Sequence, residues 1–216
     1  MAQRTIHYLF GELFSQHIKF KDKQRFLLGS VLPDAFADVS DRNKTHFKQQ
    51  IAEKNQGYFD FDKFKEQYFD LMQKDDLYLG YYMHLVEDAF YRDYIYCGRF
   101  RMPRNMEEVG ILHNDYHILN SYISEKYQLR NILETPVNFT DETICDIADF
   151  SIDEFLNDMS HDFTENTVGE TVFITENMLD EFIDNYLATG IKELTAVKNR
   201  TTFLKAIDLA YTRSKN

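Results

Sequence analysis

Apolar residues recur at helical spacing along most of the chain. Residues 5–17 place Ile6, Leu9, Phe10 and Leu13 on one face, which predicts an amphipathic helix with Thr5 as its N-cap. The same spacing predicts a helix from Asp60 or Asp62 to about residue 73. It predicts further helices over residues 21–28, 75–97, 111–127, 175–187 and 202–212. Alternating β-branched runs are few, so helix is expected nearly throughout.

Length and composition agree with that pattern. The chain has 216 residues, only 8 Gly and 3 Pro, and 15% aromatic residues, which is enough for one well-buried helical core. We see no internal repeat, low-complexity tract or linker. The sequence therefore predicts an all-α, single-domain multi-helix bundle over residues 1–216. Its metal-site half covers about residues 5–120 and its structural half about residues 121–216.

Residues 80–94 stand out because apolar and aromatic side chains fall on almost every side of the predicted helix. His84 and Asp88 lie within this stretch, four residues apart and therefore on one face. A carboxylate in such surroundings must find a partner or lose its charge. A divalent metal would satisfy both residues at once, and an internal His–Asp hydrogen bond is the alternative.

Three upstream residues favour the metal. His7 lies in the first turn of the first predicted helix, Asp34 follows Pro33 at a turn, and His46 lies at an element boundary. Together with His84 and Asp88 they supply nitrogen and carboxylate ligands typical of zinc, or of iron and manganese. Asp38 or Glu87 is a candidate to orient or deprotonate an attacking water.

Two downstream motifs carry further candidates. His113 and His117 form another pair four residues apart, with Asp115 between them. Because all three side chains cannot point the same way on one helix, either the histidine pair or Asp115 would supply the ligands of a metal site. His161-Asp162 is an HD dipeptide, which offers a separate reading as an HD-type phosphohydrolase.

Charge and hydropathy limit the partners. The formal net charge of −12 argues against binding nucleic acid or anionic membranes, although bound metal ions would still admit a phosphate-bearing substrate. No run of about 18 apolar residues and no secretory leader pattern occurs. Cys97 and Cys145 show no metal or redox spacing. We therefore expect a soluble, cytoplasmic protein without membrane insertion, and its two cysteines reduced.

Three segments together resemble one enzyme family. They read Leu28-Gly-Ser-Val-Leu-Pro-Asp34, Thr45-His-Phe47 and Gly80-Tyr-Tyr-Met-His-Leu-Val-Glu-Asp-Ala-Phe90. In the residues of these segments and in their order, the chain resembles the zinc-dependent phospholipase C family, which is similar in fold to the trinuclear-zinc single-strand nucleases. The resemblance covers roughly residues 5–120. It implies a mainly α-helical hydrolase that cleaves phosphodiesters with up to three zinc ions.

The resemblance also implies ligand sets. Asp34, His46, His84 and Asp88 would form one four-ligand site, and Asp88 would bridge to a second ion held by His7. The family's third site uses a histidine soon after the central motif and then a His-x-x-x-Glu or His-x-x-x-Asp pair. This sequence instead has Asp93 and the segment from His113 through Asp115 to His117, so the third site is expected to be altered or absent.

Two functional hypotheses follow from these residues. The first is a cytoplasmic metal-dependent phosphoesterase that cleaves a small phosphodiester or phospholipid-like substrate with metal-activated water, using one to three divalent ions, with zinc first and iron or manganese as alternatives. The second is a relative of the same fold that keeps a metal for structure or regulation without catalysis. The oligomeric state is left open.

Overall fold

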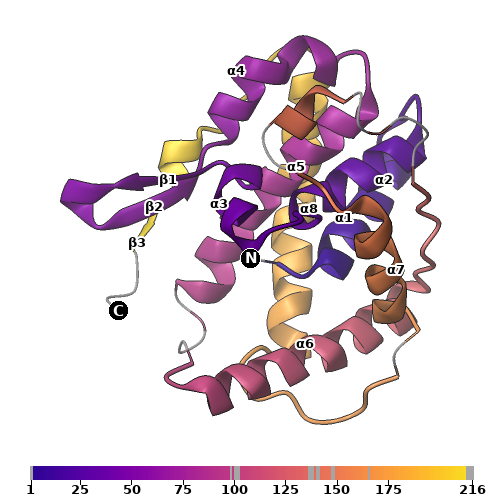
Figure 1. Cartoon of the computed structure of the whole chain (residues 1–216), viewed down its shortest axis with the longest axis vertical. Coiled ribbons are helices and arrows are strands. Elements are labelled where there is room, and N and C mark those ends of the chain that lie inside the picture. The colour runs from indigo at the N-terminus through magenta and orange to yellow at the C-terminus, as the bar shows by residue number, and fades with distance from the viewer. Residues whose placement is uncertain are drawn as a thin grey trace.

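The computed structural model describes residues 2–97, 99, 103–135, 139, 142–146, 149–164 and 166–212. These residues form a mostly helical fold around one central helix, α5 (Figure 1), which confirms the predicted all-α class. The α-helices are α1 (Arg4–His17), α2 (Lys23–Val31), α3 (Arg42–Thr45), α4 (Phe61–Met72), α5 (Asp76–Tyr91), α6 (Met106–Tyr127), α7 (Ile152–Asp162) and α8 (Glu176–Lys198). Short 3₁₀ turns cover Leu32–Asp34, Val39–Asp41, Ala52–Lys54, Thr143–Asp146 and Ala206–Leu209, and a π-helical turn covers Arg92–Tyr96.

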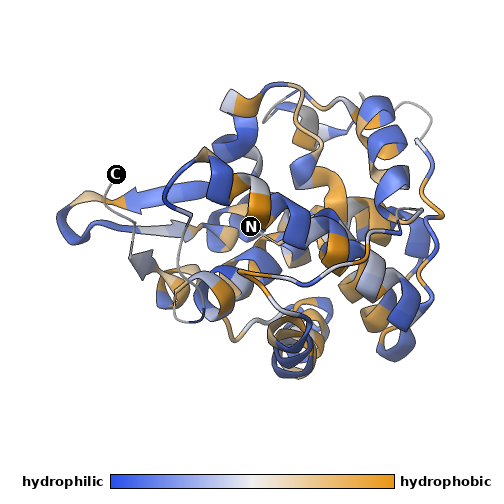
Figure 2. Cartoon of the chain, turned by 90° about the horizontal axis from the view of Figure 1, so that it is seen from below, coloured by the Kyte–Doolittle hydropathy of each residue, from blue (hydrophilic) through white to orange (hydrophobic). Residues whose placement is uncertain are grey.

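Helix α5 is buried along nearly its whole length, as its continuous apolar sequence predicts. Asp75 begins it, because its carboxylate accepts the N–H of Leu77 at 2.9 Å. The surrounding helices contribute to one continuous apolar core. In Figure 2 the outer helices carry both hydrophilic and hydrophobic segments, as expected for helices with one face against that core.

Two glycines allow α2 and α5 to cross in backbone contact. A Cβ added at Gly29 would lie 2.0 Å from the carbonyl oxygen of Leu77, and one at Gly80 would lie 2.1 Å from that of Phe26. Any larger residue would therefore push the two helices apart.

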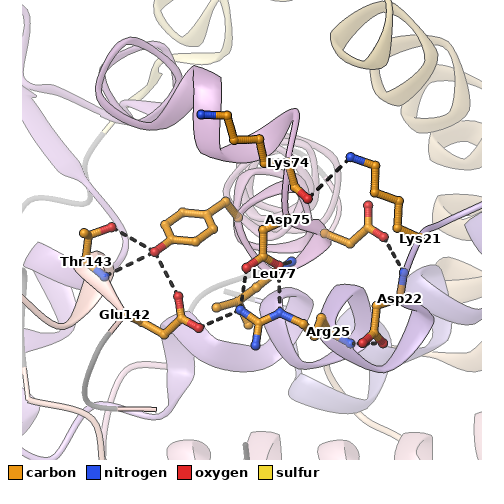
Figure 3. Close-up of polar contacts among 10 residues, drawn as sticks. Lys21, Asp22, Arg25, Lys74, Asp75, Leu77, Glu142 and Thr143 are labelled. Atoms are coloured by element: carbon orange, nitrogen blue, oxygen red, sulfur yellow. Dashed lines mark hydrogen bonds and ion pairs between the residues drawn. The ribbon is translucent and has the colours of Figure 1, made fainter. Parts of the chain in front are cut away.

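A polar cluster, which we call the Arg25 clamp, joins the start of α5 to α2 and to the 3₁₀ turn Thr143–Asp146 (Figure 3). It consists of Arg25, Asp75, Tyr78 and Glu142. The guanidinium of Arg25 donates to Asp75 at 2.7 and 2.5 Å and to Glu142 at 2.6 Å, while the Tyr78 hydroxyl donates to Glu142 at 3.0 Å. Each charge in the clamp thus faces an opposite charge.

A small antiparallel sheet projects from the helices (Figure 1). Its strands are β1 (Lys48–Ile51), β2 (Gln56–Phe59) and β3 (Tyr211–Thr212), in the order β1-β2-β3, with Lys48 opposite Phe59. The sequence predicted helix nearly throughout and no strands here. Asn55 turns the chain with a left-handed φ of 49°, a conformation that asparagine adopts readily.

Two expectations about helix ends were wrong. Thr5 does not cap α1, which begins at Arg4; its hydroxyl instead donates to Asn120 at 2.5 Å. Residues 202–212 form no long helix, because the buried carboxylate of Glu193 accepts the backbone N–H groups of Phe203 and Leu204 at 3.1 and 3.3 Å. These bonds hold that segment against α8 instead. No helix within the described ranges is both long and apolar enough to cross a membrane.

Candidate metal centre

The five residues predicted as metal ligands converge on one point in the core. His7 comes from α1, Asp34 from the turn after α2, His46 from the residue after α3, and His84 and Asp88 from α5. The three histidines and Asp88 are fully buried. Only Asp34 keeps some exposure, with 14% of its side chain accessible. The centre therefore opens to solvent on the Asp34 side.

Backbone carbonyls orient two of the histidines. The Nδ1 atom of His84 lies 2.8 Å from the carbonyl oxygen of Ser30, and Nδ1 of His46 lies 2.8 Å from that of Arg42. Because a carbonyl only accepts, each Nδ1 carries the proton and each Nε2 is free to bind. The two Nε2 atoms face each other at 3.3 Å. Two lone pairs in that position repel each other, and a proton or a metal cation between or beside them would relieve the repulsion.

The carboxylates surround the same point. Oδ1 of Asp34 lies 3.2 Å from Nε2 of His46. Oδ2 of Asp88 lies 3.7 Å from Nε2 of His46 and 3.9 Å from Nε2 of His84, while its Oδ1 accepts the backbone N–H of Ala2 at 2.8 Å. Hence each carboxylate directs one oxygen toward the paired histidine nitrogens.

His7 lies on the inner side of the cluster. Its ring stacks on that of His84, with centroids 3.7 Å apart. Its Nε2 is 3.6 Å from Oδ1 of Asp88 and its Nδ1 is 3.1 Å from Oε1 of Glu87. Glu87 is buried behind His7, where it orients or charges the ring; it is not among the residues that line the open cleft.

The pKa values reflect this crowding. Burial, together with the charge of His7, lowers the pKa of His84 to about 3, so His84 is neutral and its Nε2 lone pair is available. Burial also opposes protonation of His7, but the carboxylates of Glu87 and Asp88 raise its pKa to about 9. Burial raises the pKa of Asp34, yet the surrounding histidines outweigh this and hold it well below the usual range.

The donor set fits a divalent ion. Two groups, one of His7, Asp34 and His84 and one of His46, His84 and Asp88, each bring ligand atoms within 4.8 Å of one another. Nε2 of His7 and Oδ2 of Asp88 are buried without a hydrogen-bond partner among the described residues. Unpaired buried polar atoms are costly, and a metal would satisfy them together. Imidazole and carboxylate donors suit zinc, iron or manganese.

An open cleft of about 740 Å³ leads to this centre, with Asp34 in its wall. Helix α6 contributes His113, Tyr116 and His117 to the same cleft. His113 and His117 are exposed, and neither belongs to a described group of ligand atoms within 4.8 Å. The structure thus places the histidine pair at the cleft without joining it to the buried centre.

Three other candidates have different roles. Asp115 is fully buried and accepts the backbone N–H groups of Val172, Phe173 and Ile174 at 2.9, 2.6 and 3.1 Å, so we withdraw it as a metal ligand. Asp38 is exposed, caps a 3₁₀ turn through the N–H of Ser40 at 2.7 Å and is not among the residues that line the cleft, so nothing in the structure favours it as a catalytic base. Its side chain is used locally, as an N-cap typically is.

Glu87 is also unsuited to the catalytic role expected of it. It is buried against His7, so it can act on that ring but cannot take a proton from water in the cleft. In the HD dipeptide, His161 is exposed and Asp162 pairs with Arg4. No described group of converging ligand atoms includes either residue of the dipeptide.

The backbone groups that hold the ligands could not be inferred from residue types. They are the carbonyls of Ser30 and Arg42 and the N–H of Ala2. The contact with the Arg42 carbonyl does have a sequence signal. Arg42 lies four residues before His46, and one helical turn brings the two together. The short helix α3 supplies that turn.

The chain matches no protein-family model, no characterised protein and no solved structure. The resemblance to the zinc-dependent phospholipase C family therefore stays a prediction that rests on the motif residues. The convergence of His7, Asp34, His46, His84 and Asp88 rests on the geometry alone.

Proposed function

We propose that this protein is a metal-dependent hydrolase that cleaves a small phosphoester with metal-activated water. One observation supports it above all. His46 and His84 use their Nδ1 atoms on backbone carbonyls and turn their Nε2 atoms toward each other at 3.3 Å, next to two carboxylates. Carbonyl-oriented histidines of this kind are typical of metal ligands.

The residues divide into clear roles. His46, His84, Asp88 and Asp34 would hold one ion, and His7, with an oxygen of Asp88 or Asp34, a second. A divalent ion held there supplies Lewis-acid chemistry, because it lowers the pKa of water and offsets negative charge on a phosphoryl group. Asp34 is the partly exposed ligand, so substrate would enter from its side of the cleft.

Phosphoester chemistry is proposed over other hydrolysis for two reasons. The motif residues resemble those of a phosphodiester-cleaving family, which implies a phosphodiester or phospholipid-like substrate. The cleft of about 740 Å³ is of the size that holds a small molecule. Its lining also includes arginine and histidine side chains, which suit an anionic group.

The test combines metal loading with a substrate screen. Protein reconstituted with Zn²⁺, Mn²⁺ or Fe²⁺ should hydrolyse bis(p-nitrophenyl) phosphate or p-nitrophenyl phosphate, and chelation should abolish the activity. Asp88→Ala should lose it too, whereas Asp75→Ala, which removes a carboxylate from the Arg25 clamp on the same helix, should keep it. Bound metal without turnover of any phosphoester would contradict the catalytic proposal and leave a structural or regulatory metal.

A further inference from the structure

The arginine side chains of the cleft differ in how their charges are used. Arg4 is neutralised twice, by Asp158 at 2.6 Å and by Asp162. Arg42 also lines the cleft, but its guanidinium has no ion-pair or hydrogen-bond partner among the residues the structure describes. Arg42 is exposed, so in a chain of net charge −12 it offers a solvent-accessible positive charge beside the candidate centre.

Arg42 is tied to the centre through its main chain. Its carbonyl accepts from Nδ1 of His46 at 2.8 Å, so the residue that fixes a ligand also presents a cation at the cleft beside Asp34. Its charge reaches across the cleft: burial raises the pKa of Tyr116, and the positive charge of Arg42 opposes that rise. Arg42 and Tyr116 of α6 both line this cleft.

The chemistry of phosphate esters indicates which kind of phosphate group this cation would bind. A phosphodiester has two non-bridging oxygens and a single negative charge. A phosphomonoester has a third, and a second negative charge near neutral pH. A guanidinium binds phosphate oxygens in a fixed two-pronged geometry that a lysine does not reproduce.

We propose that Arg42 is a specificity-determining residue that anchors a terminal, dianionic phosphate group, so that the preferred substrate is a small phosphomonoester. This rests on the proposed function, since it assigns the substrate class of the same centre. Exchanging the side chain leaves the carbonyl that orients His46 in place. The role of the guanidinium can therefore be separated from the support of the metal ligand.

The experiment measures binding of inorganic phosphate to the protein loaded with stoichiometric Zn²⁺, by isothermal titration calorimetry. Arg42→Gln should weaken phosphate binding about ten- to a hundred-fold, as expected for losing hydrogen bonds to a charged group. Arg42→Lys should recover only part of it. Arg200→Gln is the matched control: it removes one positive charge from an exposed pair with Asp70 away from the cleft, and should change nothing.

Turnover gives the second readout. Arg42→Gln should raise KM for p-nitrophenyl phosphate while leaving kcat/KM for bis(p-nitrophenyl) phosphate unchanged, with metal content equal to wild type. Phosphate binding by Arg42→Gln as tight as wild type, with metal bound, would overturn the role of Arg42 and spare the proposed function. Failure of the wild-type protein to bind metal would overturn both, and metal content distinguishes the two failures.

Discussion

Two clusters of ionisable side chains link α2 or its following turn to α5, and they are built in opposite ways. In the Arg25 clamp every charge meets an opposite charge within hydrogen-bond distance, and side chains are about one fifth to one quarter exposed. In the metal centre, three histidines and Asp88 are fully buried, and several of their polar atoms have no described partner. The clamp pairs its own charges, whereas the centre leaves buried polar atoms that we propose a cation satisfies.

The comparison teaches how to separate a structural ion network from a binding site. Both contain Asp, Glu and basic nitrogen groups, so residue types do not distinguish them. Burial combined with missing partners does, because an unpaired buried polar group costs about 1–3 kcal/mol. The fold accepts that cost at the centre and avoids it at the clamp, which is expected where a ligand supplies the missing interactions.

Removing metal should produce the largest difference between the clusters. Chelation should lower the free energy of unfolding by about 4 kcal/mol relative to protein held at about a thousand times the Kd for metal. Acid should act in the same direction as the pH falls toward the pKa of about 3 of His84, because that ring must be neutral to bind a metal. Thermal unfolding with and without chelator measures the effect. Equal stability in both conditions would mean that the centre is satisfied without an ion.

Gly80→Ala should break both clusters, since it separates the helices that carry them. Its Cβ would lie 2.1 Å from the carbonyl of Phe26, and we expect a loss of about 3 kcal/mol. Gly110→Ala is the control: its Cβ meets nothing within 4 Å in the interior of α6, so it should raise stability by up to about 1 kcal/mol. Urea unfolding of the two variants provides the comparison. An unchanged free energy of unfolding in Gly80→Ala would refute the close crossing of α2 and α5.

Two tyrosines one turn apart on α5 sharpen the contrast. The Tyr81 hydroxyl donates at 2.6 Å to the carbonyl of Thr45, next to His46, whereas Tyr78 donates to Glu142 in the clamp. Tyr81→Phe should therefore weaken metal binding about ten-fold, and Tyr78→Phe should leave it unchanged. Both should lose about 1 kcal/mol of stability. Competition with a chromophoric chelator measures the affinities, and equal metal affinities in the two variants would contradict the assignment.

Arg25→Gln should give the smallest effect. It removes a partly exposed cation, so we expect about 1 kcal/mol of lost stability, and less at high salt. The loss should be the same with and without metal, because the two clusters are independent. A double comparison of wild type and variant, each with and without chelator, tests this. A metal-dependent loss would show that the clamp and the centre are coupled.

Much of the site could be predicted from sequence because its side chains obey simple spacing rules. His84 and Asp88 share a helix face, and Pro33 marks the turn that presents Asp34. The supporting carbonyls of Ser30 and Arg42 could not be predicted, since every residue has a carbonyl and only the tertiary structure selects one. Asp115 was predicted as a metal ligand for the same reason, because its three backbone partners lie near residue 173, far along the chain.

The fold shows the same division. The long periodic helices were predicted, while the hairpin over residues 48–59 and the segment after residue 201 were not. In the latter, an amphipathic pattern was overridden by Glu193, whose buried carboxylate captures the N–H groups of Phe203 and Leu204. Local pattern determines an element only where no distant polar group competes for its backbone.

Elemental analysis of the purified protein tests the central claim most directly, with Asp88→Ala and Asp75→Ala compared in parallel. Both variants remove a carboxylate from the region of α5, one from the metal centre and one from the clamp. We predict one or two equivalents of zinc, iron or manganese in wild type and in Asp75→Ala, and a loss of most of it in Asp88→Ala. Wild-type protein without metal after gentle purification and reconstitution, or Asp88→Ala with its full content, would contradict the account.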